Sequence, residues 1–503
     1  MFAAIILLFI ILFFYWNFIY KRQGLPPGPI PLPFFGNTLT LSRSKCAYLP
    51  YKIWADKFGP IYTFWMGECP IVTVTDYSLM NELFVKNGDA FIGRDFLNNL
   101  SKLVEVHTGN HGVIQTQGDT WRVMRRFGLL SMRTLGVGKA GMEKQFKEDI
   151  NEMINKLSNQ VLLNNGENIN LQLYIDRLIG STINRVLFGF TFNDNQMDEF
   201  NEIKSTFDKA SRWQFSFCGR LLVAAPILRH LPFFYQSFVE FSELPLPIYK
   251  YLNKQIENRI EMRNLKNEKK EPKDLLDCYL DQMESDEADE EFNMDNFRAL
   301  CYDLLLAGQE TTGNTLSFLV LYLLLDQRVQ SKLQAELDNL VEGNEELIGL
   351  AQRPQANYTN AVINEVQRLC NLLPLNLSHK TMFDVEIMDG KYFLKEGTVI
   401  LPQISCLLYD EKLFPNPHLF IPERFLDDKG QLKRFDSFIP FGLGKRACMG
   451  ESLARAELFL FTANFFRTFQ VLPVNPFNPP TAQKQKAFVV RPDPYNCRLI
   501  LRK

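Results

Sequence analysis

The stretch Phe441–Gly450, FGLGKRACMG in one-letter code, decides how this chain folds. Glycines punctuate it, and the apolar run Leu453–Phe466 follows at once with the pattern of a helix. Glycine reaches backbone angles that other residues avoid and leaves room for a flat ligand to approach the main chain. The loop therefore presents Cys448 just before a helix N-terminus, where the helix dipole favours a thiolate.

A thiolate presented in this way can ligate haem iron and push electron density onto it, which favours O–O bond cleavage. Arg446, two residues before Cys448, could reach a haem propionate. An isolated cysteine is more often a buried, inert thiol. The ten residues, however, resemble the Phe-x-x-Gly-x-Arg-x-Cys-x-Gly loop of the cytochrome P450 family at every fixed position. The resemblance implies haem b as cofactor, Cys448 as axial iron ligand, and cofactor contacts from Phe441, Gly442 and Gly450.

Length and composition set broad limits. At 503 residues the chain exceeds the usual single core, so one large domain or two are expected. A net charge of -2 gives no reason to expect nucleic acid. The nine cysteines are odd in number and form no Cys-x-x-Cys, which argues against disulfides or structural zinc and favours a reducing compartment. His107 and His111 lie among loop-forming residues, so we expect a surface loop there, not a metal pair.

The amino terminus predicts a membrane anchor. Phe2–Tyr20 is apolar except for one asparagine, and its nineteen residues would span roughly 28 Å as a helix. Lys21 and Arg22 follow, whereas a cleaved signal peptide would carry positive charge before the apolar run. The positive-inside rule places the rest of the chain in the cytosol, and the resemblance implies the endoplasmic reticulum membrane with a single pass. Glycosylation sequons, unused in a cytosolic domain, begin at Asn99, Asn357 and Asn376.

The chain then divides into a linker and a catalytic domain. Residues 21–34 contain Leu25–Pro29, Pro31 and Pro33, a run that cannot form helix. Such a run is typical of a stiff linker between the anchor and the folded domain, although a plain solvated linker would have the same composition. Residues 35–503 are expected to form the haem-thiolate domain.

Hydrophobic periodicity gives a coarse fold. Ile61–Trp65 and Ile71–Thr75 are β-rich and predict a hairpin, and Val385–Leu401 returns to strand-like content. Between Trp121 and about Leu340 the spacing of apolar residues is helical. The prediction is a mainly α fold with a smaller β region, which is also what the resemblance implies.

Ala307–Thr312 lies inside the long apolar helical run Phe297–Leu325. Glycine in mid-helix costs about 1 kcal/mol relative to alanine, and a carboxylate there is costly unless it is well bonded. A bent helix with threonines bonded back to carbonyls would explain the segment. Beside a thiolate loop, a local break would instead leave a groove for dioxygen, with Glu310 and Thr311 as catalytic proton donors. The segment is similar to the family's Ala-Gly-x-[Asp/Glu]-Thr motif, and this acid–alcohol pair favours monooxygenation.

Two further motifs are weak alone and gain weight from the resemblance. Glu365 and Arg368 share one face of a helix that begins near Tyr358, and Arg424 precedes the cysteine loop. A surface pair is the default for such spacing. The resemblance implies instead that Glu365, Arg368 and Arg424 form a buried structural triad.

Trp121 and Arg125 lie at helical spacing and could bind a propionate together, although an exposed basic helix with a core tryptophan is the alternative. They resemble the family's Trp-x-x-x-Arg helix. The resemblance also assigns propionate contacts to Arg94 and to His379, where a histidine replaces the more common arginine.

Electrons must come from another protein, because the chain has no Gly-x-Gly-x-x-Gly nucleotide fingerprint. Basic residues gather on the segments near the predicted haem, namely Arg122, Arg126, Arg133, Lys139, Lys144, Lys433, Arg434 and Lys445. They are either ordinary solvated charges or a docking face for an acidic electron donor. The resemblance implies NADPH–cytochrome P450 reductase as that donor, with cytochrome b5 as a possible second one.

The substrate side is rich in phenylalanine. The aromatic residues of one segment are Phe215, Phe217, Phe233, Phe234, Phe238 and Phe241. In the family this region, the segment Asn98–Gln117 and Leu372–Leu377 line the substrate cavity. Aromatic and aliphatic walls select lipophilic ligands, although some of these side chains could be ordinary core or a membrane-facing patch.

The sequence therefore predicts a membrane-anchored haem-thiolate monooxygenase that oxidises a lipophilic small molecule such as a xenobiotic, steroid or fatty acid. Two other classes stay open: a peroxide-dependent isomerase or dehydratase on the same fold, and a non-catalytic haem or lipid carrier. The pair Glu310–Thr311 argues against the isomerase, and the basic face argues against both.

Overall fold

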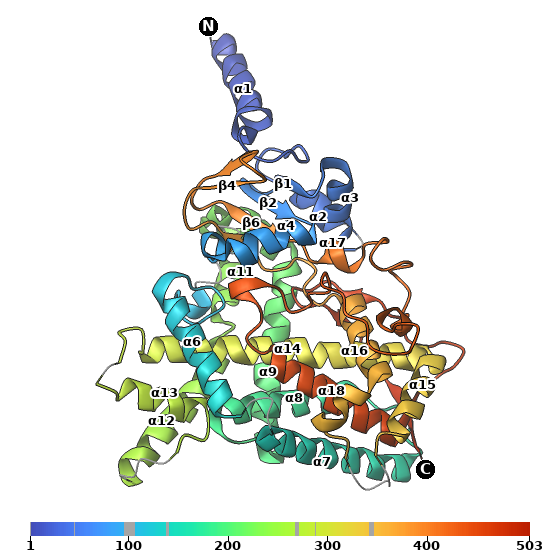
Figure 1. Ribbon diagram of the computed structural model, residues 1–503. Helices are drawn as coiled ribbons and strands as arrows, with labels where there is room; N and C mark the ends of the chain where they lie inside the picture. The colour runs from blue at the N-terminus through green and yellow to red at the C-terminus, as the bar shows by residue number, and fades with distance from the viewer. Residues whose placement is uncertain are drawn as a thin grey trace.

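The computed structural model describes residues 2–44, 46–94, 106–136, 140–266, 271–286, 288–341 and 347–502. The helices are α1 (Phe2–Phe18), α2 (Thr38–Arg43), α3 (Leu49–Phe58), α4 (Tyr77–Asn81), α6 (Gly118–Thr134), α7 (Ala140–Asn164), α8 (Leu171–Phe188), α9 (Met197–Phe215), α10 (Phe217–Ala224), α11 (Pro232–Glu243), α12 (Leu246–Lys266), α13 (Leu275–Met283), α14 (Met294–Leu325), α15 (Gln327–Asp338), α16 (Asn357–Cys370), α17 (Ser405–Leu408) and α18 (Glu451–Thr468). The strands are β1 (Ile61–Met66), β2 (Cys69–Val74), β3 (His379–Lys380), β4 (Val385–Ile387), β5 (Tyr392–Leu394), β6 (Val399–Pro402), β7 (Phe469–Pro473), β8 (Lys484–Gln485), β9 (Arg491–Pro492) and β10 (Cys497–Leu501). The predicted mainly α architecture with a smaller β region is confirmed (Figure 1).

The main sheet has the strand order β1-β2-β6-β3. Strands β1 and β2 form the predicted antiparallel hairpin, with Ile61 opposite Val74 and Met66 opposite Cys69. Strand β6 adds to β2 in parallel, and β3 pairs antiparallel with β6. The sheet therefore joins the start of the chain to the segment that carries His379, more than three hundred residues later.

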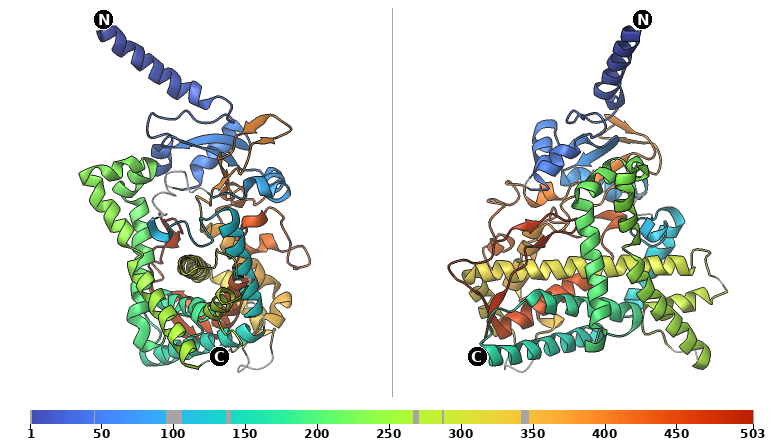
Figure 2. Two further views of the ribbon diagram at one scale, coloured as in Figure 1. Left: turned by 90° about the vertical axis from the view of Figure 1, so that its left-hand side faces the viewer. Right: turned by 180° about the vertical axis from the view of Figure 1, so that it is seen from behind.

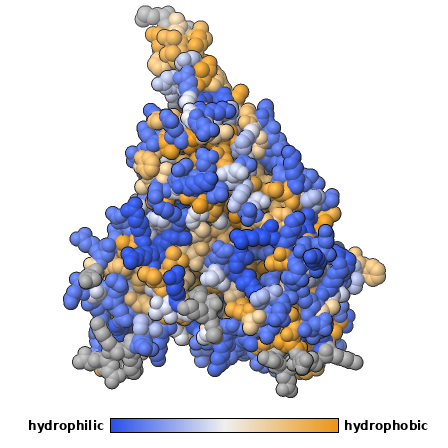
Figure 3. Space-filling model, viewed as in Figure 1, coloured by the Kyte–Doolittle hydropathy of each residue, from blue (hydrophilic) through white to orange (hydrophobic). Residues whose placement is uncertain are grey.

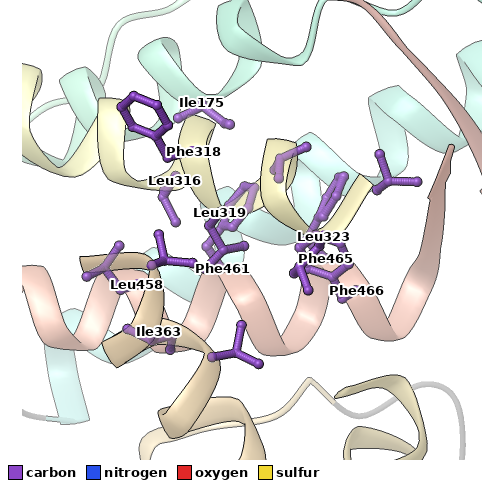
Figure 4. Close-up of a cluster of buried hydrophobic side chains, with 14 of the residues drawn as sticks. Ile175, Leu316, Phe318, Leu319, Leu323, Ile363, Leu458, Phe461, Phe465 and Phe466 are labelled. Atoms are coloured by element: carbon purple, nitrogen blue, oxygen red, sulfur yellow. The ribbon is translucent and has the colours of Figure 1, made fainter. Parts of the chain in front are cut away.

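Helix α14 crosses the body of the molecule and positions the site (Figures 1 and 2). It begins at Met294, three residues earlier than the predicted run, because the Asn293 side chain caps it by accepting the N–H of Asn296. Its second half is buried on all sides, as a continuous apolar run predicts. Figure 4 shows Leu319 and Leu323 of α14 packed among phenylalanines of α18, within the largest core cluster.

Helix α1 projects from the body at the side of the main sheet (Figure 1). Its side chains are mostly exposed and apolar, and Figure 3 shows them as a hydrophobic projection on a mixed surface. The stretch Ala4–Arg22 is the one described helical segment that is long and apolar enough to cross a membrane.

The residues after α1 pack against the β1–β2 hairpin. Lys21 Nζ lies 2.6 Å from Glu68 Oε2 in the hairpin turn. The same ammonium lies 4.8 Å from the ring centroid of Trp16 and 4.6 Å from that of Trp65, a geometry that favours cation–π attraction. The Pro-rich segment continues along the sheet, because Thr63 N donates to Pro27 O at 3.0 Å. We name this set of contacts the anchor latch.

Candidate active site

The loop before α18 needs glycine at Gly444. Its φ is +70°, and an added Cβ would lie 1.9 Å from the carbonyl oxygen of Phe84. The Cys448 amide donates to Phe441 O at 2.9 Å, which closes the loop on itself. The predicted helix after the cysteine is confirmed as α18, which begins at Glu451.

The Cys448 side chain is exposed, yet enough protein surrounds it that burial raises the pKa of its thiol. The backbone N–H of Gly450 and the positive charge of Arg125 lower that pKa, whereas the negative charge of Glu451 raises it further. An accessible sulfur beside a main-chain N–H and a guanidinium is suited to bind an electrophilic centre such as iron.

Three arginines gather beside this loop. The Arg446 guanidinium lies 4.0 Å from the ring centroid of Trp121, and that of Arg125 lies 5.9 Å from the same ring. Burial, together with the positive charges of Arg94 and Arg125, lowers the pKa of Arg446 to about 8. Burial and Arg125 likewise lower the pKa of Arg94 to about 10. The cluster is therefore electrostatically strained by its own like charges.

Within the described residues, none of these three arginines forms an ion pair with a carboxylate. Arg446 instead donates to the carbonyls of Ile92 and Thr116, and Arg125 donates to that of Ala447. Two donor atoms of the cluster, Arg94 Nε and Trp121 Nε1, are buried and have no hydrogen-bond partner in the part of the chain that the structure describes. Unpaired buried cations and donors indicate a missing anionic partner, and the carboxylates of haem would supply one.

His379 lies beside this cluster and is fully buried against it. Its Nδ1–H donates to Phe91 O at 2.7 Å. Burial and the nearby charge of Arg94 hold its pKa well below the ordinary value, so the ring is neutral. In this tautomer Nε2 carries no proton, and His379 can donate to a carboxylate only if the ring takes up a proton.

The α14 segment with the acid–alcohol motif is a continuous helix, so the expected local break is not present. The Thr311 hydroxyl donates to Ala307 O at 2.7 Å, the back-bonding that the alternative interpretation predicted. Gly308 allows α8 to approach closely, because a Cβ there would lie 2.4 Å from Ile183 Cδ1. Gly308 therefore permits close packing of α8 against α14 and does not mark a kink. Ala307 is exposed and Thr311 partly exposed, so this face of α14 stays open.

Glu310 points away from that open face. Its Oε1 lies 2.5 Å from Lys204 Nζ on α9, and Lys204 Nζ also lies 3.6 Å from Asp176 Oδ1 on α8. Burial favours the neutral amine, but the charges of Glu310 and Asp176 outweigh it and raise the pKa of Lys204. Sequence reasoning missed Lys204, because a lone lysine on an amphipathic helix carries no signal of its partner.

The residues of the expected triad meet in the core. Arg368 contacts both oxygens of Glu365, with Nε–Oε2 at 2.7 Å and NH2–Oε1 at 2.9 Å. Arg424 Nε reaches the same carboxylate at 3.1 Å. Arg368 further donates to the carbonyls of Leu408 and Pro417 at 2.8 Å each. The side chains of Glu365 and Arg368 are both fully buried, so this is a desolvated, multiply bonded charge cluster.

The surface-loop prediction for His107 and His111 is wrong in one part. His107 is only 6% exposed and lies in a helical turn among aromatic side chains, while His111 is half-buried. The glycines nearby suggested a solvated loop, but tertiary contacts from α11, α12 and α14 cover His107.

The described residues offer no ready site for a bare metal ion. Among the described residues no group of three or more histidine, cysteine, aspartate or glutamate side chains is placed to hold one. The lone thiol, the unpaired arginines and the orphaned donors fit haem together.

Comparison with known proteins agrees with this geometry. The family described as Cytochrome P450 matches residues 26–499. The chain is 33% identical over 464 residues to cytochrome P450 2C23 of Rattus norvegicus, covering 91% of this chain and 89% of that protein. It is 32% identical over 507 residues to cytochrome P450 2C70 of the same species, covering 98% of each. It is also 32% identical to cytochrome P450 2M1 of Oncorhynchus mykiss, covering 94% of this chain and 92% of that protein.

A thiolate loop beside an unpaired cation cluster defines the class as a haem-thiolate protein. The chain belongs to the cytochrome P450 family. It is thus a haem enzyme, a monooxygenase.

Proposed function

We propose that the protein is a membrane-anchored monooxygenase that inserts one oxygen atom from O₂ into a lipophilic substrate with electrons from NADPH. The observation that carries this proposal is the cluster of unpaired cations and orphaned donors around the accessible Cys448. Cys448 would be the axial ligand, with Phe441, Gly442 and Gly450 shaping its loop. Arg94, Trp121, Arg125, Arg446 and, when protonated, His379 would hold the propionates.

When bound, haem supplies the activation of dioxygen and the cleavage of its O–O bond. The protein's own residues supply protons and hold the reacting groups in position. The Thr311 hydroxyl can release Ala307 O and turn toward the open face of α14, where it would hold a water molecule. Glu310 can deliver a proton only after it breaks its ion pair with Lys204, so its role depends on movement between α9 and α14.

The substrate is proposed to be lipophilic because an apolar cluster adjoins the arginines that would hold the cofactor, through Leu377, whose carbonyl accepts from Arg94. Phe234, Phe238 and buried Phe241 pack with Ile114 of the segment before α6 and Leu377 just before His379. The expected phenylalanine wall is thus divided, since Phe217 and Phe233 are 63% and 69% exposed and face outward. Aromatic walls of this kind select a xenobiotic, steroid or fatty acid by burial and shape.

Electrons are proposed to come from NADPH–cytochrome P450 reductase, with cytochrome b5 as a second donor. The basic residues named for this face are exposed, except Lys139, which lies outside the described residues. A hollow of about 470 Å³ opens beside the cysteine loop, and its lining includes Phe441, the cations Lys433, Arg434 and Arg455, and the acids Asp436 and Glu451. Positive side chains around a recess next to the thiolate loop support docking of an acidic partner there.

The proposed location is the endoplasmic reticulum membrane, with residues 1–20 as anchor, 21–34 as linker and 35–503 in the cytosol. Lys21 and Arg22 directly after the apolar helix support this orientation. Protease added to intact microsomes should digest the domain, and Asn99, Asn357 and Asn376 should carry no glycan. A glycan at any of these sites, or full protection from protease, would place the domain in the lumen and exclude this electron source.

The decisive experiment reconstitutes the protein with the reductase and a panel of drugs, steroids and fatty acids. NADPH consumption should accompany an oxygenated product, and turnover at limiting reductase should fall with rising salt. Product from a lipid hydroperoxide without reductase would instead identify an isomerase or dehydratase, and ligand binding without turnover would identify a carrier. Cys448→His should abolish the red-shifted carbon-monoxide band of the reduced protein, and an unchanged band would exclude Cys448 as ligand.

A further inference from the structure

Three helices contact His107: two of them bond its imidazole and the third bonds its backbone carbonyl. His107 precedes α6 in the chain and is 6% exposed. Its Nε2 lies 2.9 Å from Phe241 O on α11, and its Nδ1 lies 3.4 Å from the Tyr302 hydroxyl on α14. The hydroxyl of Tyr249, on α12, donates to the His107 carbonyl at 2.6 Å.

These contacts fix the tautomer. Phe241 O can only accept, so Nε2 carries the proton and donates it. Nδ1 is then unprotonated and accepts from the Tyr302 hydroxyl. Burial holds the pKa of His107 down at about 4, so the ring stays neutral in this arrangement at neutral pH. Each ring nitrogen of His107 thus has one partner of the matching kind.

Aromatic packing completes the arrangement. The His107 ring lies 4.3 Å from the ring of Phe241, centroid to centroid, and Phe241 stacks on Trp213 at 4.0 Å. Tyr302 stacks on Tyr249 at 5.8 Å. His107 therefore sits between two aromatic pairs that belong to different parts of the fold.

The segment after His107 is tied down separately. Asp303 of α14 accepts from Val113 N at 2.7 Å and from Ile114 N at 2.9 Å. Arg446 donates to the carbonyls of Val113 and Thr116, so this end lies over the cysteine loop. The contacts from Asp303 and Arg446 hold the segment to α14 and to the cysteine loop. Among the described residues, His107 makes the hydrogen bond that joins segment 106–116 to α11.

The position of α11 matters because Phe241 and its neighbours form the apolar cluster with Ile114 and Leu377. One end of α11 carries strongly exposed side chains, with Phe233 69% and Tyr235 57% exposed, whereas Phe241 near the other end is fully buried. The contact between His107 and Phe241 therefore holds α11 at its buried end.

We propose that His107 is a positioning residue that closes segment 106–116 against α11 and thereby limits how bulky a lipophilic substrate can enter. This inference rests on the proposed function, since it assumes that the apolar cluster borders the substrate. The neutral imidazole does this by bonding two partners at once: it donates to one helix and accepts from another. An apolar side chain of similar size would fill the space without tying the helices together.

The test compares His107→Gln with His107→Leu in the full-length holoprotein. Glutamine can donate its amide N–H to Phe241 O and accept from Tyr302 through its carbonyl, whereas leucine can do neither. We expect His107→Leu to speed the association of a bulky azole inhibitor about fivefold, the factor that one typical hydrogen bond controls. A small azole should bind at the wild-type rate, and His107→Gln should restore the wild-type rate for both. His111→Gln, in the same segment, is the matched control.

Hydrogen–deuterium exchange gives a readout that does not depend on activity. Amides near Phe241 and in residues 106–112 should exchange faster in His107→Leu, while those of α18 stay unchanged. In turnover assays KM for bulky substrates should fall and kcat should change less. If His107→Leu retains the wild-type size selectivity and exchange, or if His107→Gln behaves like leucine, the proposal is wrong.

Two further outcomes can be distinguished from each other, namely a failure of the variant to bind haem and a failure of the proposed function. If His107→Leu does not incorporate haem, Tyr302→Phe removes only the hydroxyl and should show the same preference for faster bulky-azole entry. Wild-type rates in Tyr302→Phe would then overturn the assignment. If the wild-type protein neither binds nor oxidises any lipophile, the proposed function fails instead, whereas the exchange data still decide whether His107 joins segment 106–116 to α11.

Discussion

Lys204 on α9 and Glu310 on α14 form a buried ion pair, with Nζ and Oε1 only 2.5 Å apart. The contact joins a helix next to the substrate region to the helix that carries Thr311. Asp176 on α8 lies 3.6 Å from the same ammonium, so one lysine neutralises carboxylates from two helices.

Removing the lysine should therefore be costly. Lys204→Met leaves Glu310 and Asp176 buried without a cation, and we expect a loss of about 3–5 kcal/mol in the free energy of unfolding. The double variant Lys204→Met/Glu310→Gln should recover part of this loss because it removes one stranded charge. Chemical denaturation of the single and double variants measures both values. Equal stability of Lys204→Met and wild type would show that the pair does not form in solution.

Thr311→Ala should uncouple electron consumption from product formation. The variant loses the hydroxyl that bonds Ala307 O and is proposed to position a water molecule and its proton. NADPH should still be consumed with reductase, but more of it should appear as peroxide and less as oxygenated product. Thr315→Ala, which loses a similar back-bond to Thr311 O, is the control for helix effects. Unaltered coupling in Thr311→Ala would leave the hydroxyl with a helix-bonding role alone.

Glu365→Gln should destabilise the haem-side core. Glu365 receives bonds from Arg368 and Arg424, and the loss of its charge leaves the guanidinium of Arg368 buried without a counter-ion. We expect a loss of about 3–5 kcal/mol, seen as a lower midpoint of thermal unfolding and poorer haem retention. Glu423→Gln alters an acid that pairs with exposed Arg328 and Lys332 and should cost far less. A similar loss in both variants would contradict a special role for the buried cluster.

Glu457 on α18 should make stability depend on pH. It is 2% exposed, and its Oε1 has no hydrogen-bond partner among the described residues. Burial raises its pKa from 4.5 to about 8, and a hydrogen bond from Thr312 opposes the shift. The folded protein thus keeps a proton that the unfolded chain releases between about pH 4.5 and 8. The free energy of unfolding should fall as pH rises through this window, by at most about 1.4 kcal/mol per unit.

Glu457→Gln cannot ionise and should lose this part of the slope, gaining stability relative to wild type near pH 8 and little near pH 5. Denaturant titrations of both proteins at several pH values measure the difference. Parallel profiles would mean that Glu457 is already ionised or solvated in the folded state.

The anchor latch should protect the junction between helix and domain from protease. Lys21 is held by Glu68 and two tryptophan rings, so trypsin should cut after Lys21 slowly in membranes. Glu68→Gln should speed release of the domain, because the ammonium loses its counter-ion. Asp56→Asn, which alters an exposed acid paired with Lys52, is the matched control. Equal release rates in all three proteins would show that the latch does not hold.

The sequence by itself determined the loop around Cys448, the helix that follows it, the long helix α14 and the β1–β2 hairpin. Glycine placement and hydrophobic period act locally, so they can be read without the tertiary structure. It also placed Glu365 and Arg368 on one helix face, since three-residue spacing fixes that geometry. The local break predicted within Ala307–Thr312 is not present. Gly308 instead lets α8 pack closely, because a Cβ there would collide with Ile183, more than a hundred residues away in the chain.

Only the tertiary structure decided what each polar side chain faces. Lys204 meets Glu310 across a separation of 106 residues, and His107 is buried because α11, α12 and α14 fold over it. The cations Arg94, Arg125 and Arg446 become one unpaired cluster only when the sheet, α6 and the cysteine loop come together. Spacing in a sequence reports neighbours within a turn or a strand, whereas desolvation and long-range pairing depend on how distant elements pack.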